Sequence, residues 1–119
     1  MRILIVLASI AVAAMTMAVE TAPATPTAIC APAPPSRLIL RERARVSLDD
    51  PRPLNIRDGA GTDSHVIAQI PANGVLYVLE GPKCAQNYAW YRVEYMGIAG
   101  WIAEGDASAY FVEVYPPGE

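Results

Sequence analysis

The sequence predicts an all-β fold, a small and strongly bent barrel of about five to seven short strands. Two observations predict it. Short apolar stretches with alternating side chains recur between residues 37 and 115, separated by turn sequences such as Asp49-Asp50-Pro51 and Pro71-Ala72-Asn73-Gly74. No segment after residue 18 keeps the 3.6-residue period of an amphipathic helix. Many short strands in so few residues favour a sheet that bends back on itself.

A predicted β-hairpin over residues 89–103 organises this domain. Its first strand alternates, with Val93 on the face expected to be buried. Met-Gly at residues 96–97 offers the tight turn, although Asn is the favoured residue at the first turn position. Both tryptophans of the chain, Trp90 and Trp101, lie on this hairpin. Two large aromatic side chains so close in the fold share either a core or a binding surface.

Five further strands are expected outside the hairpin, at residues 37–46, 54–57, 66–70, 75–79 and 111–115. Strand alternation then predicts which apolar side chains form the interior. The predicted core is Leu54, Ile56, Ile67, Ile70, Leu76, Val78, Val93, Ile102, Phe111 and Val114.

The motifs of these strands follow one another in the order Leu54-Asn55-Ile56-Arg57, Val66-Ile67-Ala68, Gly74 to Leu79, Trp90 to Val93, and Gly100-Trp101-Ile102. This order resembles the bacterial SH3-like (SH3b) family, and the resemblance covers residues 38–115. It implies an SH3-like barrel with a single 3₁₀ turn within residues 104–110. One departure is Ala68, which stands where the family usually has Gly, so the backbone there must accept a Cβ.

The N-terminal residues are typical of an export signal. Met1-Arg2 is followed by an apolar run, and small residues at Thr16 and Ala18 favour cleavage after residue 18. An uncleaved membrane anchor is the alternative, because the run is almost long enough to span a bilayer. The expected organisation is a signal peptide at 1–18, a Pro/Ala/Thr-rich linker at 19–36, the barrel at 37–116 and a tail at 117–119. The domain is therefore expected to be secreted or extracytoplasmic.

The linker composition has two interpretations. Residues 20–36 hold many Pro, Ala and Thr and hardly a charge, so they cannot bury enough apolar surface to offset ordering. The prolines favour an extended, semi-rigid spacer. A disordered tail without a role is the alternative.

The two cysteines of the chain, Cys30 and Cys84, are expected to form a disulfide, because two cysteines in an exported chain most often pair. The bond would fasten the linker to the loop 81–88. Metal binding is the rival use, but two Cys and one His do not make a tetrahedral zinc site, so no cofactor or metal is expected. Most members of the SH3b family have no cysteine in this loop, which implies a disulfide-bearing secreted subgroup.

Several function classes lack the residues they need. The formal net charge is −3 and acidic residues interrupt the arginines of 37–57, so nucleic acid is not an expected partner. His65 is the only histidine, and no serine near it sits in a nucleophile elbow. With both cysteines assigned to a disulfide, no thiolate nucleophile remains. The sequence therefore predicts a protein that is not an enzyme.

A binding module is the favoured interpretation, because the aromatic side chains are too many to fit inside so small a barrel. The predicted ligand-binding groove is formed by Trp90, Trp101, Tyr77 and Tyr95. At least one Trp and two Tyr are expected to be substantially exposed. The resemblance implies recognition of a cell-wall peptide or glycan, or of an envelope protein, and a membrane contact only if the signal segment is retained. The alternative is that the aromatic residues complete the core of a passive structural or interaction domain.

Overall fold

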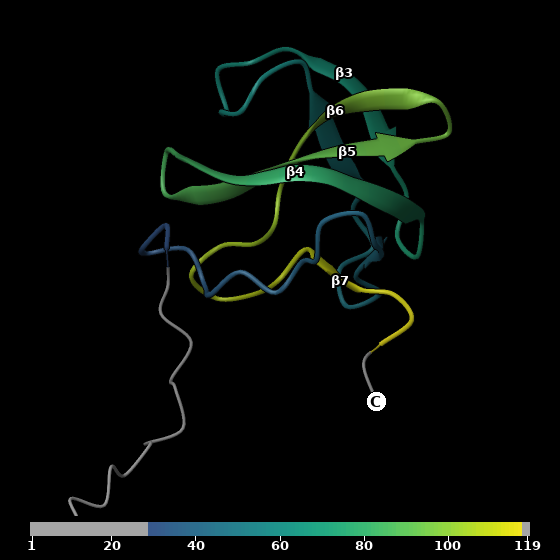
Figure 1. Cartoon of the computed structure of the whole chain (residues 1–119), viewed down its shortest axis with the longest axis horizontal. Helices are drawn as coiled ribbons and strands as arrows, with labels where there is room; N and C mark the ends of the chain where they lie inside the picture. The colour runs from purple at the N-terminus through teal and green to yellow at the C-terminus, as the bar shows by residue number, and fades with distance from the viewer. Residues whose placement is uncertain (1–28, 118–119) are drawn as a thin grey trace, which may run out of the picture.

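The computed structural model describes residues 29–117, which form one antiparallel sheet of seven strands. The strands are β1 (Arg43–Val46), β2 (Leu54–Arg57), β3 (Val66–Ile70), β4 (Val75–Ala85), β5 (Tyr88–Tyr95), β6 (Ile98–Ala103) and β7 (Val112–Val114). Their order across the sheet is β3-β2-β6-β5-β4-β1-β7, and the sheet curls into a half-barrel (Figure 1). Residues 29–117 contain no helix, and hence none that could cross a membrane. The all-β, SH3-like prediction is confirmed.

The central hairpin forms as predicted, with β5 and β6 paired from Trp90–Ala103 to Tyr95–Ile98. Its turn places Met96 at φ 49° and Gly97 at φ 83°. Two successive residues with positive φ are the geometry of a type I′ turn, whose twist matches that of the flanking strands. Met96 therefore accepts a left-handed backbone that its Cβ disfavours, and its side chain is 84% exposed.

Gly100 lets β2 approach β6 closely. A Cβ built on Gly100 would collide with the Ile56 side chain and would lie 2.7 Å from the Arg57 carbonyl oxygen. The two strands are paired only at Arg57 and Trp101, so this single approach connects the β2–β3 hairpin to the rest of the sheet. The glycine before Trp101 is thus required by packing.

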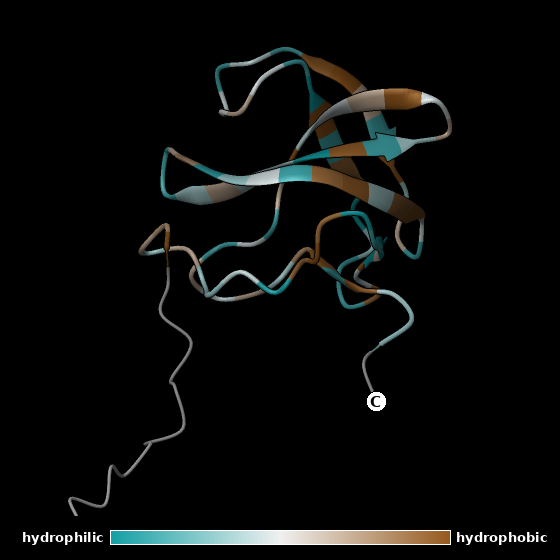
Figure 2. Ribbon diagram, viewed as in Figure 1, coloured by the Kyte–Doolittle hydropathy of each residue, from teal (hydrophilic) through white to brown (hydrophobic). Residues whose placement is uncertain are grey.

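The core lies on the concave side of the sheet, where apolar side chains of β1 to β7 meet (Figure 2). Six of the ten predicted core residues are fully buried: Ile56, Ile70, Leu76, Val78, Val93 and Ile102. Leu54 is half-buried against them. The core also contains residues outside that list of ten, namely Leu38, Ala44, Val46, Tyr91 and Val112.

Three core predictions are wrong. Ile67 is 46% exposed, because in β3 it is Ala68 and Ile70 that turn towards the interior. A Cβ is accommodated at Ala68, which packs against the core. In β7 the buried position belongs to Val112, and Phe111 and Val114 are only half-buried.

Two strands differ in length from their predicted bounds. β1 covers only residues 43–46, because Arg41 has φ 65° and the chain before it forms a turn that cannot pair as a strand. Leu38 is buried there, whereas Leu40 is 45% exposed. β4 continues beyond the expected residue 79 to Ala85, with register shifts on both sides of Glu80.

The predicted 3₁₀ turn within residues 104–110 does not form. Instead the Asp106 carboxylate accepts the N–H groups of Ser108 (2.8 Å) and Ala109 (2.9 Å), and Gly105 pairs with Tyr110 in an isolated bridge. A side chain that accepts backbone N–H groups two and three residues on replaces the hydrogen bonds of a helical turn.

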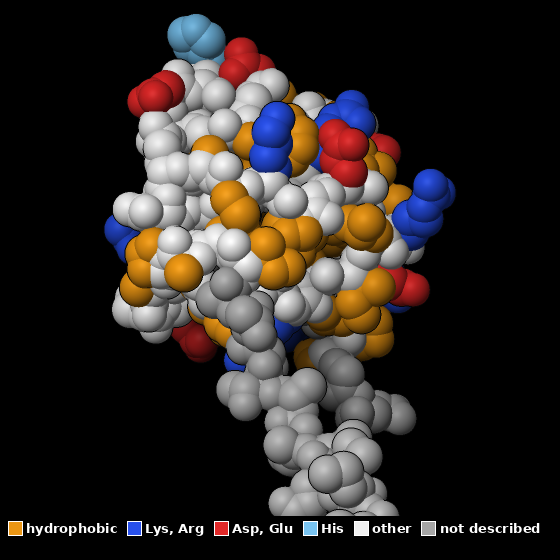
Figure 3. Space-filling model, turned by 60° about the vertical axis from the view of Figure 1, so that its left-hand side comes forward, with side chains coloured by type: hydrophobic (Ala, Val, Ile, Leu, Met, Phe, Trp, Pro, Cys, Tyr) orange, Lys and Arg blue, Asp and Glu red, His pale blue; other side chains and the backbone are white. Residues whose placement is uncertain are grey.

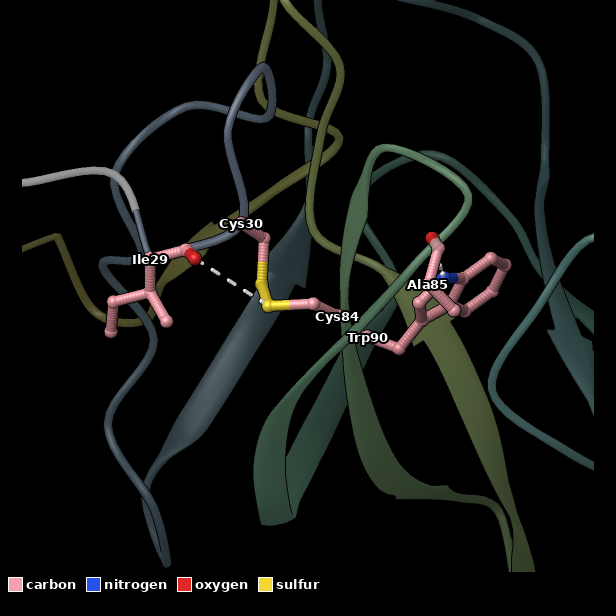
Figure 4. The surroundings of a disulfide bond; sticks show 5 residues. All are labelled: Ile29, Cys30, Cys84, Ala85 and Trp90. Carbon is pink, nitrogen blue, oxygen red and sulfur yellow. Dashed lines mark hydrogen bonds between the residues drawn. A yellow bond between two sulfur atoms is a disulfide. The ribbon is translucent and has the colours of Figure 1, made fainter.

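The predicted disulfide Cys30–Cys84 is present and joins the N-terminal segment to the tip of the β4–β5 hairpin (Figure 4). We call residues 29–38 the arm. Cys30 and Ala33 of the arm are buried together with Ala89 of β5, so packing begins before the expected domain boundary at residue 37. The expected signal peptide and most of the linker lie outside the described residues.

Removal of the disulfide is expected to destabilise the domain. A crosslink over a sequence separation of 54 residues contributes about 4 kcal/mol in the chain-entropy model. Cys84→Ala should therefore lower the thermal midpoint by several degrees or more in scanning calorimetry. An unchanged midpoint, or complete alkylation of both cysteines without reductant, would contradict the crosslink.

The sheet register can be tested with two matched valines. Val93 is 0% exposed in β5, whereas Val66 is 46% exposed in β3. Val93→Ala should lower the free energy of unfolding by about 1–3 kcal/mol, because it leaves a cavity. Val66→Ala should change it by less than about 0.5 kcal/mol. Equal costs in urea unfolding would show that the register is wrong.

Candidate functional site

An open groove lies between two segments that are far apart in the sequence, residues 46–57 and residues 103–114. Its lining is completed by Arg37, Thr62, Tyr88, Trp90 and Pro117. We call this the loop groove, because loops form most of its walls. Its aromatic lining consists of Tyr88, Trp90, Tyr110 and Phe111.

The rings of Tyr88 and Trp90 are held in fixed positions at one end of the loop groove. The Trp90 indole Nε1 donates to the carbonyl of Ala85 at 2.9 Å, across the tip of the β4–β5 hairpin (Figure 4). Tyr88 packs edge-on against Trp90, with ring centroids 5.9 Å apart. Trp90 is only 2% exposed, so Tyr88, which is half-buried, presents the accessible ring surface.

A hydrogen-bonded clasp joins this hairpin tip to the β2–β3 loop. The Gln86 side-chain oxygen accepts from the backbone N–H and hydroxyl of Thr62, and its amide donates to Asp63 at 2.8 Å. Arg57 supports the same loop by donating to the carbonyls of Thr62 (3.2 Å) and Ser64 (2.9 Å). The aromatic end of the loop groove is therefore braced from two hairpins.

Carboxylates along the loop groove are stabilised in their charged form. Hydrogen bonds from Arg52 lower the pKa of Asp50 to about 2. Hydrogen bonds from the Ser108 N–H and hydroxyl lower the pKa of Asp106 below its usual value. Both groups are ionised at neutral pH and can accept hydrogen bonds from a ligand.

The four predicted ligand-binding residues do not form one groove. Trp90 is buried beneath the lining of the loop groove, and Trp101 is half-buried, so the expectation of at least one substantially exposed Trp is wrong. Tyr95 is half-buried and packs against the core. Tyr77 and Trp101 lie on the convex face of the sheet, on β4 and β6, with β5 between them. Alternate residues of the hairpin face opposite sides of the sheet, so Tyr95 faces away from Tyr77 and Trp101.

Exposure of the aromatic residues is lower than expected. Among the Trp and Tyr residues of 29–117 only Tyr77, at 39%, is more than about a third exposed. Trp101 is partly covered by Lys83, whose ammonium lies 5.8 Å from the ring centroid. Figure 3 shows apolar side chains gathered over one face of the molecule, with single acidic and basic side chains between them.

Residues 52–110 match the family model described as bacterial SH3 domain. The domain belongs to the bacterial SH3 family. The match begins just before β2 and ends at Tyr110, so it includes strands β2 to β6 and part of each wall of the loop groove. No curated protein matches the chain. The family is one of binding domains that are usually not catalytic.

Glu104, which directly follows β6 of this SH3 domain, is a buried carboxylate that the sequence reasoning did not select. It is 1% exposed, and its Oε2 accepts the backbone N–H groups of Arg37 (2.8 Å) and Leu38 (3.2 Å) in the arm. Its Oε1 has no hydrogen-bond partner. Burial raises the pKa of Glu104, and the hydrogen bonds from the arm only partly oppose that shift. The sequence holds no signal for this role, because a single Glu after a strand is an ordinary surface residue.

The raised pKa of Glu104 predicts a pH dependence of stability in this SH3 domain. Above the ordinary glutamate pKa of 4.5, the unfolded chain releases a proton that the folded chain still holds. The free energy of unfolding should therefore fall as the pH rises through the folded-state pKa. Glu104→Gln keeps an oxygen acceptor and removes this dependence, so its stability relative to the natural chain should improve as the pH rises.

The measurement is urea unfolding between pH 4 and pH 8 for both proteins. Glu94→Gln is the control, because it changes the net charge equally at an exposed position. A stability difference between Glu104→Gln and the natural chain that stays constant over this range would contradict the assignment.

Proposed function

We propose that this bacterial SH3 domain is an extracytoplasmic, non-catalytic module that binds a peptide or a peptidoglycan fragment in the loop groove. One observation carries the proposal: the lining of an open groove combines aromatic rings with carboxylates that stay charged at neutral pH. The rings offer apolar contact area that costs little side-chain ordering. The carboxylates supply acceptors for the N–H and ammonium groups of a peptide.

The chemistry of the groove supports binding without turnover. His65 lies in the β2–β3 loop and is not part of the groove lining. Ser47 and Ser108, which are part of it, therefore have no imidazole beside them to act as a base. Within residues 29–117 no group of three or more His, Cys, Asp or Glu side chains is placed to hold a metal ion.

An oxidising compartment is the location that suits the disulfide. A bond between Cys30 and Cys84 persists outside the cytoplasm, where thiols are not kept reduced. This observation supports an extracytoplasmic domain, together with the export signal expected from the sequence.

A second candidate is a protein–protein interaction without a small ligand. β3 lies at the edge of the sheet, and its Val66 and Ile67 are each 46% exposed. An edge strand with exposed apolar side chains can add a strand from another chain. This candidate places the contact on β3, on the opposite side of β2 from β6.

The test has two parts. The full mature chain is titrated with soluble peptidoglycan fragments while its tryptophan fluorescence is measured. A pull-down with purified sacculi is the second part. We expect a saturable change, because Trp90 lies under the aromatic end of the groove. Tyr88→Ala should weaken binding by about ten-fold or more, as truncation of a central aromatic contact commonly does. Tyr77→Ala is the matched control and should leave binding unchanged, because Tyr77 lies on the convex face.

Two outcomes would contradict the proposal. If Tyr77→Ala weakens binding as much as Tyr88→Ala, the ligand contacts Tyr77, which the sequence analysis included in its predicted groove. If neither fragments nor sacculi bind the natural chain, the wall ligand is excluded and the interaction surface on β3 becomes the better candidate.

A further inference from the structure

After a turn at residues 29–33, in which the Ala33 N–H donates to the Cys30 carbonyl, the rest of the arm lies against the domain as a bound peptide lies against a receptor. It contributes no strand to the sheet, and it runs alongside the segment that follows β6 (Figure 1). Its sequence Ala31-Pro32-Ala33-Pro34-Pro35 holds three prolines in five residues. Such a segment loses little conformational freedom when it is bound, which is why proline-rich peptides are common ligands of aromatic grooves.

Tyr110 makes two different contacts with the arm. Its hydroxyl donates to the carbonyl of Pro35 at 2.7 Å, and its ring lies under the Arg37 guanidinium, 4.0 Å from Cζ to the ring centroid. The first contact recognises backbone, and the second recognises a cationic side chain two residues later. Arg37 and Tyr110 both line the loop groove, so the arm reaches into one end of it.

Glu104 completes this set of contacts from beneath. Its carboxylate accepts the N–H groups of two successive arm residues, Arg37 and Leu38. Together Tyr110 and Glu104 contact one backbone carbonyl, one guanidinium and two backbone N–H groups. The guanidinium contact selects arginine, and a proline two residues before it lowers the ordering cost of the bound chain; in the arm these residues are Pro35-Ser36-Arg37, so the pattern is Pro-x-Arg.

The remaining contact is covalent and reducible. Cys30 at the start of the arm is buried, whereas Cys84 on the domain is exposed to solvent. A small dithiol can therefore reach the bond from the Cys84 side, and it would convert the bond to two thiols while the dithiol becomes a disulfide. After that step the arm is held by its non-covalent contacts and by its peptide link to β1 through residues 39–42.

We propose that Tyr110 and Glu104 form a peptide subsite at one end of the loop groove, selective for extended Pro-x-Arg segments, and that the arm is its tethered occupant. This inference rests on the proposed function and assigns a ligand class to part of the same groove. A partner peptide with this sequence pattern competes with the arm. The disulfide sets the effective concentration of the arm and hence the strength of that competition.

The experiment uses the full chain with four substitutions, Cys30→Ser, Cys84→Ser, Pro35→Ala and Arg37→Ala, which remove the disulfide and the guanidinium contact and so weaken the arm as a competitor. The probe is a fluorescent synthetic peptide with the sequence of residues 31–38. Its binding is measured by fluorescence anisotropy. The substituted chain should bind it at least about ten-fold more tightly than the oxidised natural chain, whose arm competes at a roughly millimolar or higher effective concentration. A probe with Ala in place of Arg should bind several-fold more weakly, because the contact with the Tyr110 ring is lost.

The proposal is overturned if the substituted chain is folded by circular dichroism and binds the probe no better than the natural chain. It is also overturned if the Arg and Ala probes bind equally. Tyr110→Phe in the substituted chain is the matched control, since it removes the hydrogen bond to the carbonyl and keeps the ring. It should weaken both probes by the same factor.

A second measurement applies if the substituted chain does not fold. Hydrogen exchange of the Arg37 and Leu38 amides is followed in the natural chain, oxidised or reduced with a dithiol, with unlabelled peptide at about 10 mM, above the millimolar effective concentration of a tethered segment. The peptide should accelerate exchange of both amides in the reduced protein and not in the oxidised one. Absence of acceleration in the reduced protein overturns the proposal.

These results separate the subsite from the proposed function. If the Pro-x-Arg probe fails while peptidoglycan fragments still bind with the dependence on Tyr88, the groove is a binding site without this subsite. If the probe binds while the fragments do not, the subsite stands and the wall ligand does not.

Discussion

Buried Glu104 is the residue on which the connection between β5, β7 and the arm depends. Its backbone N–H donates to Ala89 of β5, and its carbonyl accepts from Phe111 and Val112 at the start of β7. Its side chain accepts the arm. One residue therefore connects β5, β7 and the N-terminal segment. A charged or polar group at 1% exposure is stable only when these partners stay in place, which ties the position of the arm to the closure of the sheet.

Contacts outside the hydrophobic core likewise determine the shape of the loop groove. Gly100 allows β2 to sit close to β6, the Gln86 clasp fixes the two hairpin tips, and the turn at Asp106 shapes the opposite wall. None of these groups belongs to the hydrophobic core. The core sets the curvature of the sheet, and polar contacts at its rim set the dimensions of the site.

Sequence reasoning predicted the strands well where alternation and turn residues agree, as in β2, β3 and the β5–β6 hairpin. It failed where the register of a strand determines which of its side chains are buried. Ile67 was predicted to be inside because four of the five residues of β3 are apolar, and alternation does not choose a face reliably in such a strand. The site was harder to predict, because Trp90 is buried by the hairpin tip and Glu104 is buried by the arm. Both burials come from contacts over long sequence separations, which a local pattern does not contain.

The position of the disulfide determines how the domain responds to mechanical force. Tension that enters the chain ahead of Cys30 passes through the Sγ–Sγ bond to Cys84 and into the β4–β5 hairpin, without loading the arm beyond Cys30. The hydrogen bonds at Tyr110 and Glu104 then bear no part of the load. After reduction the same tension would pass along the arm, and the hydrogen bonds at Tyr110 and Glu104 would break one after another. The covalent bond thus shields one end of the groove from forces on the N-terminal side of the domain.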